Sequence, residues 1–138
     1  MNNKEDKKQR ILGIDYGSKR VGLALSDENG QFAMPLSVVE NDDMLMEKIR
    51  KIALDNEIGV MVMGESRNYD GKPNSILLDS ITLKENLEAE GYIVHFEPEF
   101  MTSVQAERFQ GKTDMLDASA AALILQSYLD RDKESELN

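Results

Sequence analysis

The sequence contains no cysteine and no tryptophan, and it has one histidine among its 138 residues. Without cysteine the chain cannot form a disulfide bond, a thiolate metal site or a cysteine nucleophile. This composition fits a reducing compartment, and residues 1–10 lack the apolar segment of an export signal, so we expect a cytoplasmic protein. The single histidine, His95, lies in a predicted strand, where a histidine is more often structural or exposed than catalytic.

Long apolar runs are also absent. The longest ones, such as residues 118–125, fall far short of the roughly 20 residues that a membrane-spanning helix needs, so we expect no membrane association. Hydrophobic residues make up 41% of the chain and charged residues 30%, as in an ordinary globular protein. At this length we expect a single domain over residues 1–138, with flexible tails at 1–9 and about 132–138.

Positive charge is scarce, because 26 acidic residues outnumber 16 basic ones and give a net charge of −10. Affinity for nucleic acid comes largely from cationic contacts to phosphate, so this balance argues against a general polyanion binder. It leaves room for a local basic site, since Lys19 and Arg20 lie together in a predicted turn. Charge runs of this kind are, however, more often solvated surface than a docking site.

Residues 11–27 are typical of a strand, a tight turn and a second strand. The first apolar run ends with Asp15, and a Gly-Ser-Lys-Arg turn then reverses the chain. A carboxylate at the end of a buried strand costs several kcal/mol unless it is paired, metal-bound or solvated. Asp15 is therefore a candidate functional residue, with a turn-forming role beside Gly17 as the alternative.

The rest of the chain alternates strands and helices with short connections. Strands are expected at residues 32–39, 60–63 and 92–96, and helices after a cap at Asn41 or Asp42, at about 75–90, at 102–110 and from 114 to about 131. This order predicts an α/β fold with a five-stranded mixed sheet, three antiparallel strands and then two parallel ones, flanked by helices. The polar segment 64–74 follows a predicted parallel strand, where open α/β sheets hold ligands.

Three further acids occupy positions where a carboxylate is unusual. Glu97 and Glu99 leave a predicted strand two residues apart and share one face, and Asp117 lies on the helix stripe expected to face the sheet. With Asp15 they could form a hard-oxygen site suited to Mg²⁺ or Mn²⁺. Each also has an ordinary explanation: the glutamates as solvated loop residues, and Asp114 and Asp117 as first-turn acids that favour the helix dipole.

Four stretches of the sequence resemble one known family. GIDYGSKRVGLALSD at residues 13–27 is similar to the opening motif of the YqgF/RuvX family, whose members are described as pre-16S rRNA nucleases and as Holliday junction resolvase-like. Residues 64–71, 99–108 and 116–129 resemble that family in the same order. The opening motif alone also resembles phosphate loops of sugar kinases and actin-like ATPases, but that architecture needs two such domains and this chain holds one.

The resemblance implies an RNase H-like fold and a nuclease that uses Mg²⁺, with Mn²⁺ as a substitute. It places the family's acidic positions on Asp15, Glu99 and Asp117 as catalytic residues and metal ligands, with Asp114 as an additional candidate. Two ions about 4 Å apart would then activate a water and stabilise the leaving oxygen, with no side-chain base. Substrate contacts are expected from the first turn and from the loop after Gly64, at Gly17, Ser18, Lys19, Arg20, Arg67 and Asn68.

Two departures from the family pattern concern the substrate side. Phe100 stands where the family usually has arginine, and residues 65–67 are polar where the family tends to be apolar with a proline. On the resemblance alone, 5′-end processing of pre-16S ribosomal RNA is the favoured function. The alternatives are a Holliday junction resolvase-like endonuclease for branched DNA, which usually requires a symmetric dimer, and a noncatalytic RNA-binding or assembly module.

Overall fold

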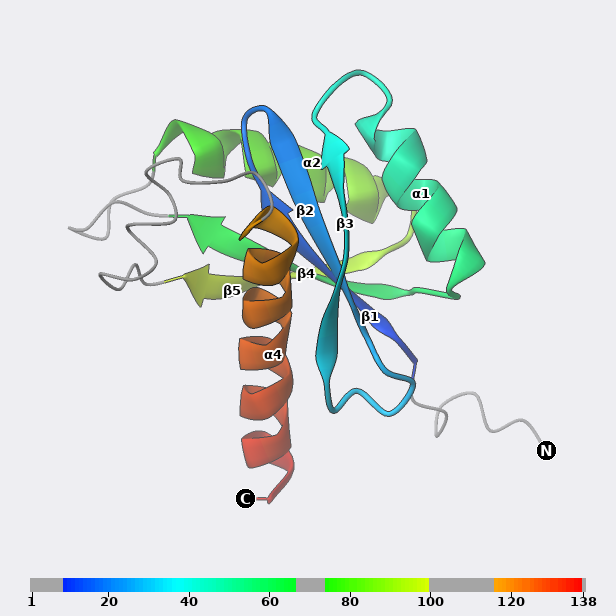
Figure 1. Cartoon of the computed structure of the whole chain (residues 1–138), viewed down its shortest axis with the longest axis vertical. Helices are drawn as coiled ribbons and strands as arrows, with labels where there is room; N and C mark the ends of the chain where they lie inside the picture. Colours follow the sequence, from blue (N-terminus) through cyan, green and yellow to red (C-terminus); the bar gives the residue numbers. More distant parts are fainter. Residues whose placement is uncertain (1–8, 67–73, 100–115, 138) are drawn as a thin grey trace.

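The computed structural model describes residues 9–66, 74–99 and 116–137 of the chain. These residues form one five-stranded sheet with helices on both faces (Figure 1). In chain order the elements are β1 (Ile11–Tyr16), β2 (Arg20–Ser26), β3 (Ala33–Glu40), α1 (Leu45–Asp55), β4 (Val60–Ser66), α2 (Ser75–Ala89), β5 (Ile93–Glu99) and α4 (Leu116–Leu137).

The strands lie in the order β3-β2-β1-β4-β5. The first three pair antiparallel, whereas β4 pairs parallel with β1 on one side and with β5 on the other. The predicted α/β fold, with three antiparallel strands followed by two parallel ones, is therefore confirmed. Because parallel strands run in the same direction, β1, β4 and β5 all end at the same edge of the sheet.

Side chains alternate along the strands and divide the interior into two layers. Leu12 and Ile14 of β1 belong to the larger core, which α1 and α2 cover. On the opposite face α4 packs against all five strands and buries Val62 of β4 together with its own Leu125 (Figure 1). We call the side of the sheet that α4 covers the α4 face.

Gly13 of β1 determines how closely α4 approaches the sheet. A Cβ atom at this position would lie 2.8 Å from Cβ of Leu125 and 3.0 Å from the carbonyl oxygen of Ala121. Contacts this short with a side-chain stem and with helix backbone leave no room for a larger residue. The helix is thus fitted directly onto the strand that carries Asp15.

Two strands run further than the sequence predicted. β4 ends at Ser66 rather than at Met63, and β5 ends at Glu99 rather than at Phe96. The expectation that Pro98 ends the pairing is wrong, because Pro98 stays in register opposite Glu65 of β4. Among the described strands β5 lies at the edge of the sheet, so one of its sides pairs with none of them. Proline is tolerated in such a strand, because the position of its missing N–H can fall on the unpaired side.

Helix boundaries differ from the prediction in two places. The N-cap residue of α1 is Met44, whose side chain makes no capping hydrogen bond. The prediction that Asn41 or Asp42 is the N-cap residue is therefore wrong. At the other end of the chain, α4 continues to Leu137 instead of stopping at about Arg131. The predicted short helix at 102–110 and residues 114 and 115 of the last helix lie outside the described residues. No helix in the described segments combines the length and apolar character that crossing a bilayer requires.

Candidate active site

Asp15 is the fifth residue of β1 and pairs with Gly22 of β2. Its neighbour Ile14 points into the core under α1 and α2, so alternation along the strand places Asp15 on the α4 face. The residue is partly buried, as expected for a carboxylate near the end of a buried strand. It therefore stands at the carboxyl edge of the parallel strands, under the helix that carries Asp117.

The register shows what lies beside Asp15 on the neighbouring strands. Gly64 of β4 and Glu97 of β5 pair with each other, one residue beyond the row that contains Ile14. Neighbouring strands are about 4.8 Å apart, so the backbones of Asp15 and Glu97 are separated by roughly 10 Å. Because the residue between them is glycine, no side chain from β4 occupies the space between the two acids.

The other two predicted ligands are placed by their backbone. Glu99 ends β5 two residues beyond Glu97, and residues two apart in a strand share a face, so Glu99 also lies on the α4 face. Asp117 is the second residue of α4, one helical turn before Ala121, which packs against Gly13. The backbone positions of all three acidic residues therefore lie at the carboxyl edge of the parallel strands.

The metal site itself stays a prediction. Within residues 9–66, 74–99 and 116–137, no three His, Cys, Asp or Glu residues are grouped so that they could hold a metal ion. The side chains of Glu99 and Asp117 lie outside the described part of the molecule, as do Asp114, Arg67 and Asn68 altogether.

A tight turn over residues 17–19 connects β1 to β2. A Cβ atom at Gly17 would lie 2.5 Å from the carbonyl oxygen of Arg20, so this position requires glycine. Ser18 and Lys19 are exposed, whereas Arg20 is partly buried. The turn thus presents a lysine to solvent, four residues along the chain from Asp15.

Glu97 is buried on the α4 face, with 6% of its side chain exposed, and its Oε1 lies 2.5 Å from Nη2 of Arg131 in α4. Among the described residues no donor is aligned for a hydrogen bond to this oxygen, so the contact is an ion pair. Burial raises the pKa of Glu97 above its ordinary value, although the charge of Arg131 and a hydrogen bond from Ser127 act in the opposite direction. The carboxylate of Glu97 therefore connects β5 to α4.

His95 makes a second contact between the same two elements. Its ring stacks on that of Tyr128, with centroids 5.6 Å apart and planes 19° apart. His95 precedes Glu97 by two residues, and Tyr128 precedes Arg131 by three, so the two contacts follow each other along β5 and α4. This stacking supports the structural role expected for His95.

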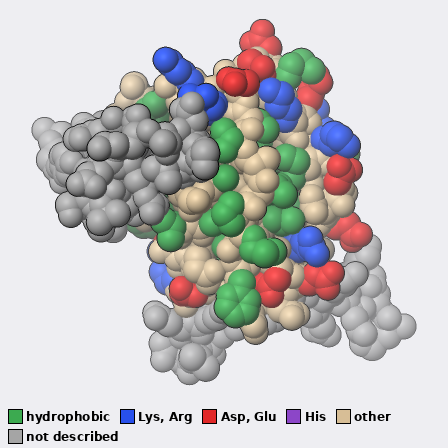
Figure 2. Space-filling view, viewed as in Figure 1, with side chains coloured by type: hydrophobic (Ala, Val, Ile, Leu, Met, Phe, Trp, Pro, Cys, Tyr) green, Lys and Arg blue, Asp and Glu red, His purple; other side chains and the backbone are tan. Residues whose placement is uncertain are grey.

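The described residues that Figure 2 colours show how charge is distributed in this view. Figure 2 shows acidic and basic side chains mixed around the margin of this view and hydrophobic ones in its middle. The exposed hydrophobic residues of the molecule include three at and before β3: Phe32, Met34 and Leu36. Among the coloured residues of this view there is no continuous basic area, in agreement with the acidic composition.

Comparison with known sequences gives consistent matches along the chain. The family model described as "RuvX: Holliday junction resolvase" matches residues 9–131. Proteins named "Putative pre-16S rRNA nuclease" are similar over nearly their full length. The protein from Lactobacillus helveticus is 32% identical, with 88% of this chain and 96% of that protein covered. The one from Lactobacillus gasseri is 34% identical, with 92% and 99% covered.

Comparison with solved structures adds the fold. Thermus thermophilus RuvC in complex with a Holliday junction substrate superimposes with a TM-score of 0.56 at 15% identity, covering 91% of this chain and 96% of that one. The fowlpox virus Holliday junction resolvase gives a TM-score of 0.53 at 13% identity, covering 89% and 99%. Together with the sheet order, these likenesses identify the fold as RNase H-like.

Proposed function

This chain belongs to the RuvX family, and on that basis we propose that it is a nuclease that hydrolyses phosphodiester bonds in the 5′ precursor segment of 16S ribosomal RNA. The observation that carries the proposal is the placement of Asp15 in a family match that spans residues 9–131. The residue lies one position before the end of β1 on the α4 face, at the edge where the parallel strands finish.

The RNA substrate is inferred from the curated relatives. They are named "Putative pre-16S rRNA nuclease", and the similarity covers 96% to 99% of their length and 88% to 92% of this chain, so it extends well beyond a single motif. We accordingly treat residues 1–138 as one nuclease domain, and a ribosomal RNA substrate implies a cytoplasmic location.

We assign Asp15, Glu99 and Asp117 as the catalytic carboxylates and as ligands of Mg²⁺, for which Mn²⁺ is a substitute. The donor set supports this assignment, because carboxylate oxygens without histidine or cysteine suit hard divalent ions. The ion pair between Glu97 and Arg131 supports Glu99 as the ligand on β5, because the carboxylate of Glu97 is already engaged. Asp114 is retained as an additional candidate.

The chain's own groups have separate tasks in this mechanism. The three carboxylates hold the metal ions, which when bound supply activation of a water molecule and stabilisation of the leaving oxygen. The turn of Gly17, Ser18, Lys19 and Arg20, together with Arg67 and Asn68, binds the phosphate backbone. No side chain is required to act as a general base.

A second candidate function is cleavage of branched DNA. It is favoured by the description of the matching family model as a Holliday junction resolvase. The two substrates would use the same carboxylates, so the acidic residues do not discriminate between them. They differ in symmetry, because paired cuts across a four-way junction call for a two-fold dimer.

The test is to incubate the purified protein with Mg²⁺ and either labelled pre-16S RNA fragments or a labelled four-way DNA junction. The proposal predicts cleavage of the RNA, and Asp15→Asn should abolish it. Asp79→Asn removes an exposed carboxylate on α2, on the opposite side of the sheet, and should leave cleavage unchanged.

Each other outcome has a defined meaning. Cleavage of the junction alone would favour the second candidate. Binding of RNA without cleavage at any Mg²⁺ concentration would instead indicate a noncatalytic module. Full activity in the Asp15→Asn variant would show that the site assignment is wrong.

A further inference from the structure

Asn41, the residue directly after β3, contacts the turn between β1 and β2 twice. Its side-chain Nδ2 donates to the carbonyl oxygen of Gly17 at 2.8 Å. Its backbone N–H donates to the carbonyl oxygen of Lys19 at 2.9 Å. One residue, 24 positions along the chain from Gly17, therefore holds the first and the last peptide carbonyl of the turn.

These two hydrogen bonds also determine where the amides of the turn point. A trans peptide is planar, so the N–H of a residue points opposite to the carbonyl of the residue before it. With the carbonyl of Gly17 directed at Asn41, the N–H group of Ser18 is directed away from it. By the same rule the N–H of Arg20, the first residue of β2, points toward β1 within the sheet, so Ser18 supplies the amide that the turn presents.

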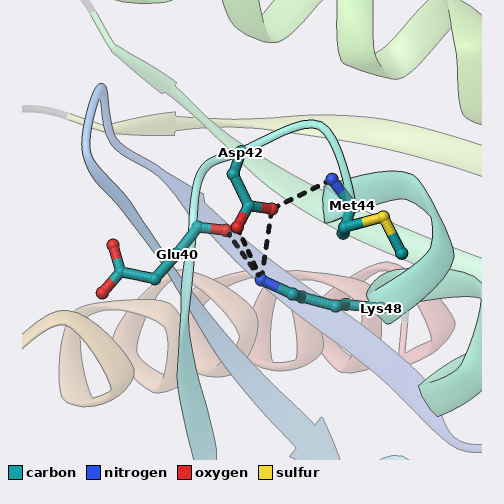
Figure 3. Close-up of polar contacts among 4 residues, drawn as sticks. All are labelled: Glu40, Asp42, Met44 and Lys48. Carbon is teal, nitrogen blue, oxygen red and sulfur yellow. Dashed lines mark hydrogen bonds and ion pairs between the residues drawn. The ribbon is translucent and has the colours of Figure 1, made fainter.

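The residues on either side of Asn41, Glu40 and Asp42, both contact Lys48 of α1 (Figure 3). Nζ of Lys48, in α1, donates to the carboxylate of Asp42 at 3.2 Å and to the carbonyl oxygen of Glu40 at 3.5 Å. The same carboxylate accepts the backbone N–H of Met44 at 3.0 Å. The residues before and after Asn41 are thus tied to the start of α1, which fixes the backbone from which Asn41 reaches the turn.

We propose that Asn41 is a positioning residue for the substrate, which holds the turn so that the backbone amide of Ser18 and the side chain of Lys19 receive a phosphate group of a nucleic acid strand. The inference rests on the proposed nuclease function and extends it to a residue outside the acidic site. Backbone amides and a cation in a glycine-containing turn are a suitable environment for an anion. Asn41 does not touch the phosphate; it acts through Gly17 and Lys19.

The test uses Asn41→Ala, which removes the side-chain hydrogen bond and keeps the backbone one. Loss of one hydrogen bond that orders a binding turn should raise KM for the labelled pre-16S RNA fragment about three- to tenfold, with kcat within about twofold of wild type. Asn41→Asp keeps the shape but loses the donor and adds a negative charge, so its KM should rise further, and more at low salt than at high salt.

Asn56→Ala is the matched control. The side chain of Asn56 also donates to a backbone carbonyl, that of Ile52 at 2.9 Å, but at the opposite end of α1. This variant should keep the wild-type KM and kcat. Amide hydrogen exchange adds a readout of the turn itself, since the amide of Ser18 should exchange faster in Asn41→Ala and at the wild-type rate in Asn56→Ala.

The outcomes separate this inference from the function on which it rests. If the wild type cleaves and Asn41→Ala matches Asn56→Ala in KM, the inference is wrong and the proposed function stands. If Asn41→Ala lowers kcat with KM unchanged, Asn41 does not position the substrate in the way proposed. A wild-type protein that neither binds nor cleaves the RNA overturns both.

Discussion

Arg131→Ala tests the ion pair that connects β5 to α4. The side chain of Glu97 is 6% exposed, whereas that of Arg131 is 54% exposed. Removing one partner of a fully buried pair costs roughly 3–5 kcal/mol, because the other charge is left without compensation. Since the arginine is half in solvent and its charge is partly screened, we expect a loss of about 2 kcal/mol in the free energy of unfolding at pH 8.

The loss should depend on pH, with a sign that follows from the pKa of Glu97. Burial raises this pKa above the ordinary value of 4.5, and Arg131 opposes the rise, so the substitution raises the pKa further. A carboxyl whose pKa is higher in the folded protein stabilises the fold fully below its unfolded pKa and loses that contribution as pH rises through the folded pKa. The difference between wild type and variant should therefore be largest at pH 8 and shrink as the pH falls toward 4.5.

The assay is urea unfolding followed by circular dichroism at several pH values, with EDTA present to remove divalent ions. Glu97→Gln is the partner variant, because it keeps the size of the side chain and removes the charge. The double variant Glu97→Gln/Arg131→Ala should be more stable than Arg131→Ala at pH 8. A loss of stability in Arg131→Ala that is the same at every pH would refute the account of Glu97 as a buried charge held by Arg131. An equal loss when Arg131→Ala is added to the Glu97→Gln variant would refute it as well.

Two further predictions concern the packing and the capping of helices. Gly13→Ala should lower the free energy of unfolding by about 1–3 kcal/mol in the same urea assay, because the new Cβ would lie 2.8 Å from Cβ of Leu125. Gly59→Ala, where the Cβ meets only the flexible end of Gln9, is its control and should cost less. Asn74→Ala should cost about 1 kcal/mol, because the side chain of Asn74 accepts the N–H of Leu77 at the start of α2; Asn74→Ser should recover most of it.

The sheet could be predicted because its signals are local. Alternating apolar residues mark β1 and β2, and a continuous apolar run marks β4 as a strand buried on both faces. Gly30, between β2 and β3, and Gly91, after α2, both have a positive φ, which glycine adopts readily. The end of β5 could not be predicted in the same way, because proline breaks pairing in a central strand and is tolerated in an edge strand. Which strand lies at the edge depends on the tertiary order.

The site was predicted less completely because its contacts join distant elements. Glu97 and Arg131 are 34 positions apart, and the predicted helix stopped at about Arg131, so no helix face could be assigned to that residue. Asn41 carried a recognisable signal, a polar residue before a helix, but that signal is typical of an N-cap. Its side chain is used instead on Gly17, a contact that depends on how β3 passes the first turn.

The two glutamates of β5 have different roles in the proposed mechanism. They share one face of one strand, and a sequence pattern gives them equal standing. The inner one, Glu97, pairs with Arg131 of α4, and the outer one, Glu99, is the last residue of the strand. The pairing also fixes α4 relative to β5, and α4 carries Asp117. A carboxylate that binds no metal in the proposed mechanism therefore helps determine whether the three proposed ligands can meet.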